Sequence, residues 1–190
     1  MTKPYSKTRI LVECALMVAL GTVLSNIRFF TMPNGGSITL FGNLPFILVS
    51  FRHGTKWGVF TGFVDACLSL LLNFYAPPTK NLLFLIGSVL LDYVLACMAL
   101  GLASLFARPF RNRLAGVAFG TFMACFLEFV CSFLSGGLIW PNLSDKFGPW
   151  GYSLMYNGSY MLPEALLTVL AAVLLYKVAP QLFDAQHAKA

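Results

Sequence analysis

Long apolar stretches, separated by short segments of basic or turn-forming residues, run through the whole of this sequence. A helix needs roughly 20 consecutive apolar residues to cross the hydrocarbon core of a bilayer. The chain of 190 residues is 58% hydrophobic and only 11% charged, whereas soluble domains carry about 25% charged residues. One core cannot bury that much apolar surface in so short a chain. The sequence therefore predicts an integral membrane protein embedded in the lipid bilayer.

We predict an all-α fold of six transmembrane helices that forms a single domain over residues 1–190, because neither a strong internal repeat nor a linker divides the chain. The second predicted span is short and contains Pro45, so we expect it to be tilted, broken or partly re-entrant. The predicted spans cover residues 9–27, 37–51, 56–74, 82–107, 114–140 and 153–178.

The basic residues predict how these helices are oriented. Most lie at the two ends of the chain and in the loops after the second and fourth spans: Lys3, Lys7, Arg9, Arg52, Lys56, Arg108, Arg111, Arg113, Lys177 and Lys189. The other loops carry Arg28, Lys80 and Lys146. The positive-inside rule then predicts a multi-pass plasma-membrane protein with both termini in the cytoplasm. Basic residues in loops, rather than along one polar face, also argue against nucleic-acid binding.

Acidic residues lie inside the predicted spans, at Glu13, Asp65, Asp92, Glu128 and Glu164. A charge at membrane depth costs roughly 2.5–3.5 kcal/mol on insertion scales, and no Lys or Arg lies deep in a span to offset it. A cationic ligand would compensate such a carboxylate, and protonation or a polar network between helices is the alternative. We expect Glu13, near the cytoplasmic start of its helix, to snorkel or cap; the sequence assigns no role to Asp65 or Glu164.

Polar and aromatic residues from three predicted helices fall at a similar depth in the outer half of the membrane. Ser132 follows Glu128 by one helical turn and shares its face, and Gly136 would let a ligand or a backbone approach closely. Aromatic rings attract cations, a carboxylate supplies the counter-charge, and an amide pairs with an amino-heterocycle. The pattern favours a pocket for a flat, cationic heterocycle, with structural polar contacts between helices as the alternative. The candidate ligand-binding residues are Asp92, Tyr93, Glu128, Ser132, Gly136, Trp140, Tyr152 and Asn157.

Several segments resemble a known family. Met32-Pro33-Asn34-Gly35-Gly36-Ser37-Ile38-Thr39-Leu40 is similar to the Met-Pro-x-Gly-Gly-Ser-x-Thr-Leu segment of the thiamine-specific substrate-binding subunit of energy-coupling factor (ECF) transporters. Leu91-Asp92-Tyr93 looks like the acidic-Tyr pair in that family's fourth helix. Further resemblances, at the end of the fifth helix and the start of the sixth, lie in Phe133–Gly136 with Trp140, Pro149–Leu154, Tyr156–Tyr160 and Leu162–Glu164.

The resemblance implies a six-helix ECF substrate-binding fold with an outward-facing pocket. It implies that Asp92 faces the thiazolium cation beside Tyr93, that Trp140 and Tyr152 stack on the ligand, and that Asn157 holds the aminopyrimidine. It further implies that the first outer loop closes over the pocket as a lid formed by Pro33, Asn34, Gly35 and Gly36.

The sequence departs from the family at two positions. Ser132 stands where a His is common, and Glu128 stands where a basic residue often occurs. An extra carboxylate favours a cation and disfavours a phosphorylated ligand. A related pyrimidine or another thiamine derivative therefore stays an alternative to thiamine.

The resemblance also implies partners: an ECF transmembrane coupling subunit and two ATPase subunits. Ala15 and Ala19 resemble the small-xxx-small motif of the first helix that packs on the coupling subunit, although ordinary close helix packing has the same pattern. The chain contains no Walker A motif, so we expect it to hydrolyse no ATP. The expected function is thus high-affinity binding of thiamine outside the cell and its delivery by ATP-driven partners.

Two other classes compete with this interpretation. An autonomous proton-coupled transporter would use the membrane carboxylates as a relay. A small membrane enzyme would need a nucleophile–base pair or a metal set, but His53 and His187 lie at predicted cytoplasmic positions and the cysteines lack metal-ligand spacing. We therefore expect no enzymatic activity, no cofactor and no metal site.

Overall fold

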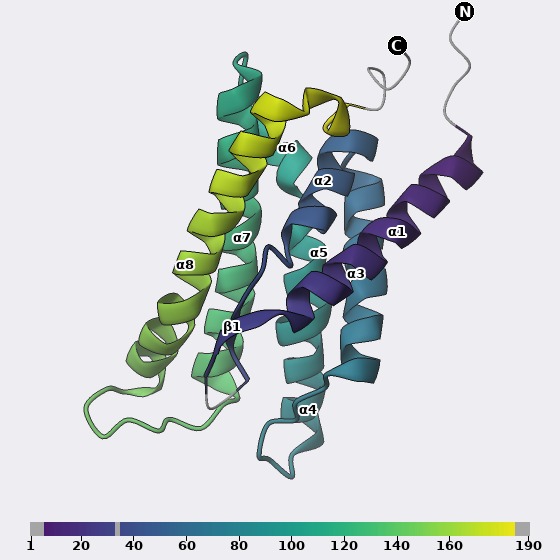
Figure 1. Cartoon of the computed structure of the whole chain (residues 1–190). Helices are drawn as coiled ribbons and strands as arrows, with labels where there is room; N and C mark the ends of the chain where they lie inside the picture. Colours follow the sequence, from purple (N-terminus) through teal and green to yellow (C-terminus); the bar gives the residue numbers. More distant parts are fainter. Residues whose placement is uncertain (1–5, 33–34, 185–190) are drawn as a thin grey trace, which may run out of the picture.

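Helices run side by side through most of the molecule, as the computed structural model shows (Figure 1). The structure describes residues 6–32 and 35–184. The first turn of the first helix and the last short helix lie at one end of the molecule, which we call the terminal end (Figure 1). In chain order the elements are α1 (Lys7–Asn26), β1 (Arg28–Thr31), β2 (Ser37–Thr39), α2 (Leu44–His53), α3 (Thr55–Leu72), α4 (Leu82–Ser88), the π-helix η1 (Val89–Leu95), α5 (Ala96–Leu100), α6 (Ala103–Ala107), α7 (Arg113–Leu138), α8 (Pro149–Val178) and the 3-10 helix η2 (Pro180–Leu182).

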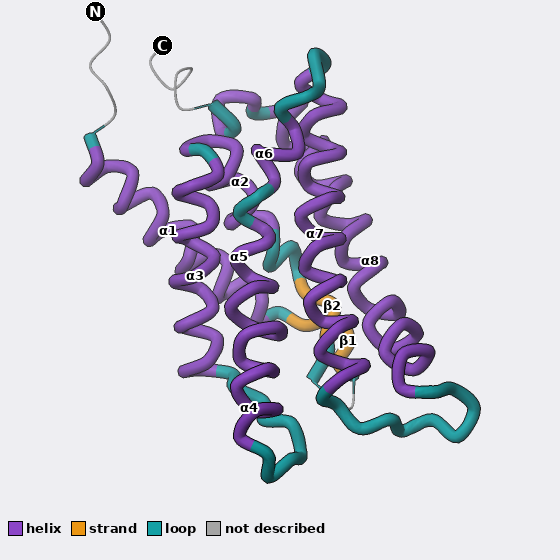
Figure 2. The backbone as a smooth tube through the Cα atoms, turned by 180° about the vertical axis from the view of Figure 1, so that it is seen from behind, coloured by secondary structure: helices purple, strands orange, loops and turns teal. Residues whose placement is uncertain are grey.

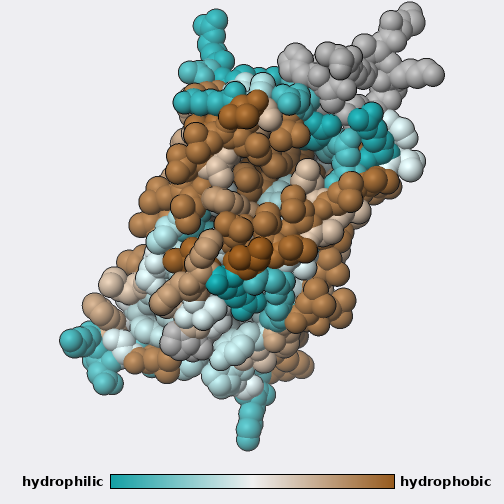
Figure 3. Space-filling view, in the orientation of Figure 1, coloured by the Kyte–Doolittle hydropathy of each residue, from teal (hydrophilic) through white to brown (hydrophobic). Residues whose placement is uncertain are grey.

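Five helices within the described residues are long and apolar enough to cross a bilayer. They are α1, α3, the continuous helix 82–100 formed by α4, η1 and α5, α7, and α8. They correspond to the first, third, fourth, fifth and sixth predicted spans. On the face shown, apolar residues cover most of the middle of the molecule, and hydrophilic ones gather at its two ends and in one patch below the centre (Figure 3). This distribution matches a protein whose waist faces lipid.

The second predicted span, residues 37–51, has a different structure from a full transmembrane helix. Its first residues form β2, which pairs antiparallel with β1, and helix begins only at Leu44. The ten residues of α2 extend about 15 Å at the α-helical rise, half the thickness of the hydrocarbon core. Seen from behind, both strands lie in the same half of the molecule as α4, away from the terminal end (Figure 2).

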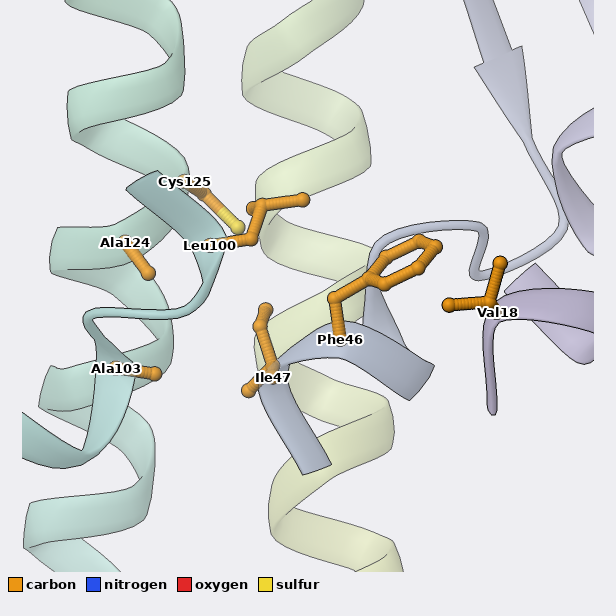
Figure 4. Close-up of a cluster of buried hydrophobic side chains, with 7 residues drawn as sticks. All are labelled: Val18, Phe46, Ile47, Leu100, Ala103, Ala124 and Cys125. Carbon is orange, nitrogen blue, oxygen red and sulfur yellow. The ribbon is translucent and has the colours of Figure 1, made fainter. Parts of the chain in front are cut away.

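The short α2 forms the centre of the apolar core. Phe46 and Ile47 are buried and lie in one cluster with side chains of α1, α5, α6 and α7 (Figure 4). Because these neighbours surround α2, its apolar residues are shielded from lipid as well as from water. The cluster consists of Val18, Phe46, Ile47, Leu100, Ala103, Ala124 and Cys125.

The fourth predicted span is interrupted twice. The π-helix η1 occupies Val89–Leu95, and the helix ends at Leu100 before resuming as α6 at Ala103. A Cβ at Gly101, in the break between α5 and α6, would collide with the backbone of α3 at Val59. The backbone of this break is therefore in direct contact with the backbone of α3. Small residues at such crossings are typical of membrane helices. A π-helical turn inside a longer helix often marks a functional site.

Helix α8 begins at Pro149, four residues before the predicted start. Proline suits the first turn of a helix because its missing N–H would have no intrahelical partner. A second proline, Pro163, lies inside α8 without ending it. The 30 residues of α8 reach about 45 Å, so the helix extends beyond the hydrocarbon core or tilts within it.

Candidate functional site

A cavity of about 500 Å³ lies between the β1–β2 hairpin, η1, α7 and α8. The hairpin that contributes to its wall lies in the half of the molecule away from the terminal end (Figure 1). Its volume is in the range of pockets for small organic ligands. Its wall includes all eight of the residues predicted to bind a ligand: Asp92, Tyr93, Glu128, Ser132, Gly136, Trp140, Tyr152 and Asn157. The structure thus brings these residues together, while their contact with a ligand stays a prediction.

The π-helix η1 aims Asp92 at the outer part of α7. Its Oδ2 accepts hydrogen bonds from Ser88 Oγ at 3.0 Å, Ser135 Oγ at 2.7 Å and Trp140 Nε1 at 3.0 Å. All three donors are neutral, and Oδ1 accepts no hydrogen bond from any residue that the structure describes. Asp92 is therefore fixed through Oδ2 by three neutral donors, and within the described residues its Oδ1 stays without a hydrogen bond.

Two stacked rings cover this carboxylate. The rings of Tyr75 and Trp140 are nearly parallel, with 10° between their planes and 5.7 Å between their centroids. The backbone N–H of Tyr75 donates to the hydroxyl of Tyr93 at 2.9 Å, which ties the loop after α3 to η1. This wall combines flat π-faces with a nearby negative charge, and such a combination attracts cationic rings.

Three tyrosines follow one face of α8 at helical spacing. Tyr152, Tyr156 and Tyr160 all line the cavity, and the centroids of neighbouring rings in this row are 5.8 Å apart. The hydroxyl of Tyr156 accepts a hydrogen bond from the backbone N–H of Gly36 at 3.4 Å. The row therefore connects the cavity wall to the hairpin turn.

The predicted lid is the turn of the hairpin. Gly35 and Gly36 line the cavity, while Pro33 and Asn34 lie outside the described residues. Gly35 has φ +91°, a left-handed conformation that glycine adopts without strain. A Cβ at Gly36 would be pressed against the ring of Tyr160. Both glycines thus let the backbone approach the aromatic wall closely.

Two further carboxylates hold the segment that follows the hairpin turn. Glu128 Oε2 accepts from Asn43 Nδ2 at 2.7 Å. Glu164 accepts from the backbone N–H of Thr39 at 3.0 Å and from the Thr39 hydroxyl. Glu164, to which the sequence assigned no role, therefore fastens β2 to α8 and lines the cavity.

Asn157 is already occupied by protein partners. Its Nδ2 donates to the carbonyl of Ser132 at 3.2 Å and to both oxygens of Ser153 at 3.0 and 3.1 Å. Its Oδ1 accepts from the Tyr160 hydroxyl at 3.0 Å. At Gly136 an added Cβ would meet the side chains of Ser153 and Asn157. The missing side chain at Gly136 therefore lets α8 pack closely against α7, and Asn157 joins the two helices.

The remaining predicted positions lie away from the cavity. Ala15 and Ala19 are exposed on α1, on a face that no described element covers. Glu13 pairs with Arg52 at 2.7 Å and with Arg9 at 3.1 Å, and lies 2.8 Å from a ring nitrogen of His53. It therefore ties α1 to the end of α2 rather than snorkelling. Asp65 is buried in α3 and is not part of the cavity wall.

Sequence reasoning missed several cavity residues. The spacing of Tyr152, Tyr156 and Tyr160, four residues apart, was a signal that would have found the tyrosine row. Ser135, which donates to Asp92 although it is not part of the cavity wall, follows Ser132 by three residues, which was a weaker signal. Thr39 lies in the segment that resembles the family but had no role assigned to it, and no local pattern marked Asn43 or Tyr75, because these roles depend on contacts with residues far away in the sequence.

Comparisons with known proteins add independent evidence. The family model described as "Thiamine transporter protein (Thia_YuaJ)" matches residues 11–184. Thiamine transporter ThiT of Bacillus subtilis (strain 168) is 30% identical over 191 residues, covering 94% of this chain and 95% of that protein. Thiamine transporter ThiT of Lacticaseibacillus paracasei is 28% identical over 196 residues, covering 95% and 92%. The solved structure of ThiT from Listeria monocytogenes has the same fold, with a TM-score of 0.78, 21% identity and coverage of 94% and 98%.

Proposed function

Because the chain belongs to the thiamine transporter protein family, we propose that it binds thiamine in the cavity between the hairpin, η1, α7 and α8. The observation that carries this proposal is the arrangement around Asp92: a carboxylate fixed by neutral donors, with one oxygen free, beside the stacked rings of Tyr75 and Trp140. Thiamine is a cation with two flat aromatic rings joined by a methylene group. Such a molecule needs a counter-charge and π-faces in the same place, and this cavity has both.

The proposed role of each residue that lines the cavity follows from the chemistry of its side chain. Asp92 balances the positive charge of the thiazolium ring, and Tyr93, Trp140 and Tyr152 contact the flat faces of the ligand. Glu128 and Ser132 offer acceptors and a donor to the polar edge of the aminopyrimidine. Asn157 contributes by holding α8 against α7, because its amide is already bonded within the protein.

We propose that the cavity faces the outside of the cell and that both ends of the chain lie in the cytoplasm. The terminal end carries Arg52, Arg113 and Lys177, and the opposite loops contain fewer basic residues. This asymmetry supports a cytoplasmic terminal end by the positive-inside rule. The hairpin turn then lies between the external medium and the cavity, where it serves as the lid.

The protein acts as a binding subunit in this proposal and performs no chemistry on its ligand. The sequence contains no Walker A motif, so accumulation against a gradient requires ATPases on other chains. We propose a transmembrane coupling subunit and two ATPase subunits of the ECF type as these partners. The exposed face of α1 around Ala15 and Ala19 is the proposed contact with the coupling subunit, since two small residues one turn apart let another helix approach.

Calorimetric titration of the purified protein in detergent tests the ligand. We expect thiamine to bind with a Kd below 1 μM, that is, with more than about 8 kcal/mol, and a neutral pyrimidine of similar size to bind far more weakly. If neither thiamine nor a close analogue binds more tightly than micromolar, the proposed ligand is wrong.

A further inference from the structure

We propose that a second cavity, which we call the basic cavity, binds the phosphate group of an anionic phospholipid between Arg108 and Arg113. Its described lining shares no residue with the cavity proposed to bind thiamine. The inference therefore goes beyond the proposed function and does not depend on the identity of the transported ligand.

The basic cavity lies where several segments meet: the ends of α2 and α8, α6 with the loop that follows it, the start of α7, and the residue after η2. The loop between α6 and α7 lies at the terminal end (Figure 1). The volume of the basic cavity is about 190 Å³, on the order of ten times the 10–15 Å³ that one water molecule needs. A phosphate group therefore has room in it.

The charge of the wall favours an anion. Arg108 and Arg113 both line the basic cavity, and none of the described residues that line it is acidic. Arg108 makes no hydrogen bond or ion pair with any residue that the structure describes. A nitrogen of Arg113 lies 3.8 Å from a carboxylate oxygen of Asp184, which is beyond hydrogen-bond range. Both arginines are exposed, so their guanidinium groups, whose planar geometry suits phosphate oxygens, are accessible to a headgroup at the membrane surface.

Aromatic side chains form another part of the wall. Phe183 is buried, and its ring centroid lies 5.6 Å from that of Phe51 and 5.3 Å from that of Tyr176. The hydroxyl of Tyr176 has no hydrogen-bond partner among the described residues, so it offers a neutral donor in addition to the two charges. Apolar rings beside the guanidinium groups lower the local dielectric constant, which strengthens their attraction for an anion.

An apolar ridge continues from the basic cavity along the outside of α7. Phe110 lines the basic cavity and packs against Phe119, with 4.9 Å between the ring centroids. Phe119, Phe122 and Phe126 follow one another at helical spacing and are 41–45% exposed. From Phe119 to Phe126 the helix rises about 10 Å, less than half the roughly 30 Å of the hydrocarbon core. A phospholipid suits this arrangement because its acyl chain can lie on the ridge while its phosphate lies in the basic cavity.

The general excess of basic residues in cytoplasmic loops explains a positive charge at this end of the molecule. It does not explain why Arg108 and Arg113 share one cavity, whereas Arg111, between them in the sequence, is exposed and does not line it. Basic pockets between membrane helices at the cytoplasmic surface are known binding sites for lipid headgroups. The selective placement of the two arginines thus favours a lipid site over a diffuse charge.

Native mass spectrometry of the protein in detergent, titrated with phosphatidylglycerol or with phosphatidylcholine of identical acyl chains, tests the proposal. The proteins are the wild type, the double variant Arg108→Gln with Arg113→Gln, and the matched control Lys56→Gln with Arg111→Gln, which removes two exposed charges outside the basic cavity. In the wild type we expect the first phosphatidylglycerol to bind more than fivefold more tightly than phosphatidylcholine, whose trimethylammonium group the arginines repel.

This preference should fall below twofold in the double variant and stay above fivefold in the control. A preference of fivefold or less in the wild type, a preference of twofold or more in the double variant, or an equal fall in the control would overturn the proposal. If the double variant does not fold, Arg108→Gln alone decides: its preference should fall by more than twofold relative to Arg111→Gln, and a smaller fall rejects the site.

Two further measurements identify other occupants. Glycerol 3-phosphate should bind the wild type far more weakly than phosphatidylglycerol; equal affinity would show a site for free phosphate groups and would reject the lipid. If the double variant keeps its lipid preference but no longer co-purifies with partner subunits, the arginines form a protein contact and the proposal is wrong. Thiamine affinity should be the same in all variants, so a failure to bind thiamine would concern the proposed function alone.

Discussion

Asp92 illustrates at the scale of one residue how this protein combines rigidity with ligand binding. Ser88, Ser135 and Trp140 all donate to the same oxygen, so the carboxylate keeps its position without a ligand. Its negative charge, however, is balanced by neutral dipoles alone. In the proposed function a cationic ligand supplies the missing opposite charge, and the carboxylate does not have to be rearranged first.

Asp92→Asn should weaken thiamine binding by about 10- to 100-fold, because a charge–charge interaction in a shielded site becomes a neutral hydrogen bond. Titration calorimetry with thiamine and with an uncharged analogue of the same shape would measure the effect. Asp145→Asn is the control for loss of a carboxylate outside the cavity. An equal loss of affinity for the uncharged analogue would show that Asp92 acts through shape and not through its charge.

Residues of the wall were predictable from the sequence to different degrees. Asp92, Glu128, Ser132, Trp140 and Tyr152 could be predicted as one cluster, since helical spacing and depth place them together. Thr39, Asn43 and Tyr75 could not, because each lies in a non-helical segment or at a helix start and meets its partner only through the tertiary fold. The occupied amide of Asn157 was equally hidden, because a sequence does not show which partners a polar side chain will find.

The β1–β2 hairpin is the element that the proposed function assigns to control access to the cavity. Its turn contacts the tyrosine row at Tyr156 and Tyr160, and β2 is bonded to α8 through Thr39 and Glu164. The same hairpin continues from α1, since the N–H of Leu40 donates to the carbonyl of Ile27 at 3.0 Å. Movement of the lid therefore involves both the cavity wall and the helix proposed to contact the coupling subunit.

Thr39→Val should lower the free energy of unfolding by about 1–3 kcal/mol, because Glu164 loses a hydroxyl donor that the valine cannot replace. Thermal unfolding in detergent would report this change, and hydrogen exchange of the hairpin amides should become faster. Thr31→Val, on the exposed strand β1 of the same hairpin, is the matched control. Equal effects of the two substitutions would argue against a special role of the Thr39–Glu164 contact.

Ala15→Trp together with Ala19→Trp should leave thiamine affinity unchanged but prevent assembly with the coupling subunit. The reason is steric: these small residues are exposed on α1, far from the cavity wall, and bulky rings would keep a partner helix away. Co-purification of the subunits would measure assembly. Leu166→Trp with Leu170→Trp, at exposed positions one turn apart on α8, is the control and should assemble normally.

The long helices were predictable as elements, whereas for the second span the sequence predicted an irregular, tilted, broken or partly re-entrant segment without revealing its strand. Continuous apolar runs of sufficient length predict membrane helices because lipid leaves the backbone few alternatives. Residues 37–51 were equally apolar, but the structure uses them as a strand and a short buried helix whose backbone is shielded by surrounding helices. The π-helix and the break before α6 also arise from packing against α3 and α7, which periodicity does not reveal.

The whole molecule divides into two functional halves along the membrane normal. The half away from the terminal end contains the cavity, and the terminal half contains the apolar core, the Glu13–Arg52 pair and most basic residues. This division predicts a binding subunit that captures its ligand on one side and depends on other proteins for energy. The solved structure of ThiT from Listeria monocytogenes shares this fold, with a TM-score of 0.78 at 21% identity.

Liposomes that contain the protein alone should therefore bind thiamine without accumulating it. Liposomes that also contain the coupling subunit and both ATPases should accumulate thiamine when ATP is supplied to the cytoplasmic face, because hydrolysis then drives release. Uptake of radiolabelled thiamine would distinguish the two preparations. Accumulation by the protein alone, driven by a pH gradient, would instead support an autonomous proton-coupled transporter.

The most direct test of the central claim is an experimental structure of the protein purified in the presence of thiamine. The account predicts one thiamine molecule in the cavity, with its cationic ring next to Asp92 and its flat faces against Trp140 and Tyr152. Thiamine bound elsewhere on the protein, or a cavity that stays empty at saturating thiamine, would contradict it.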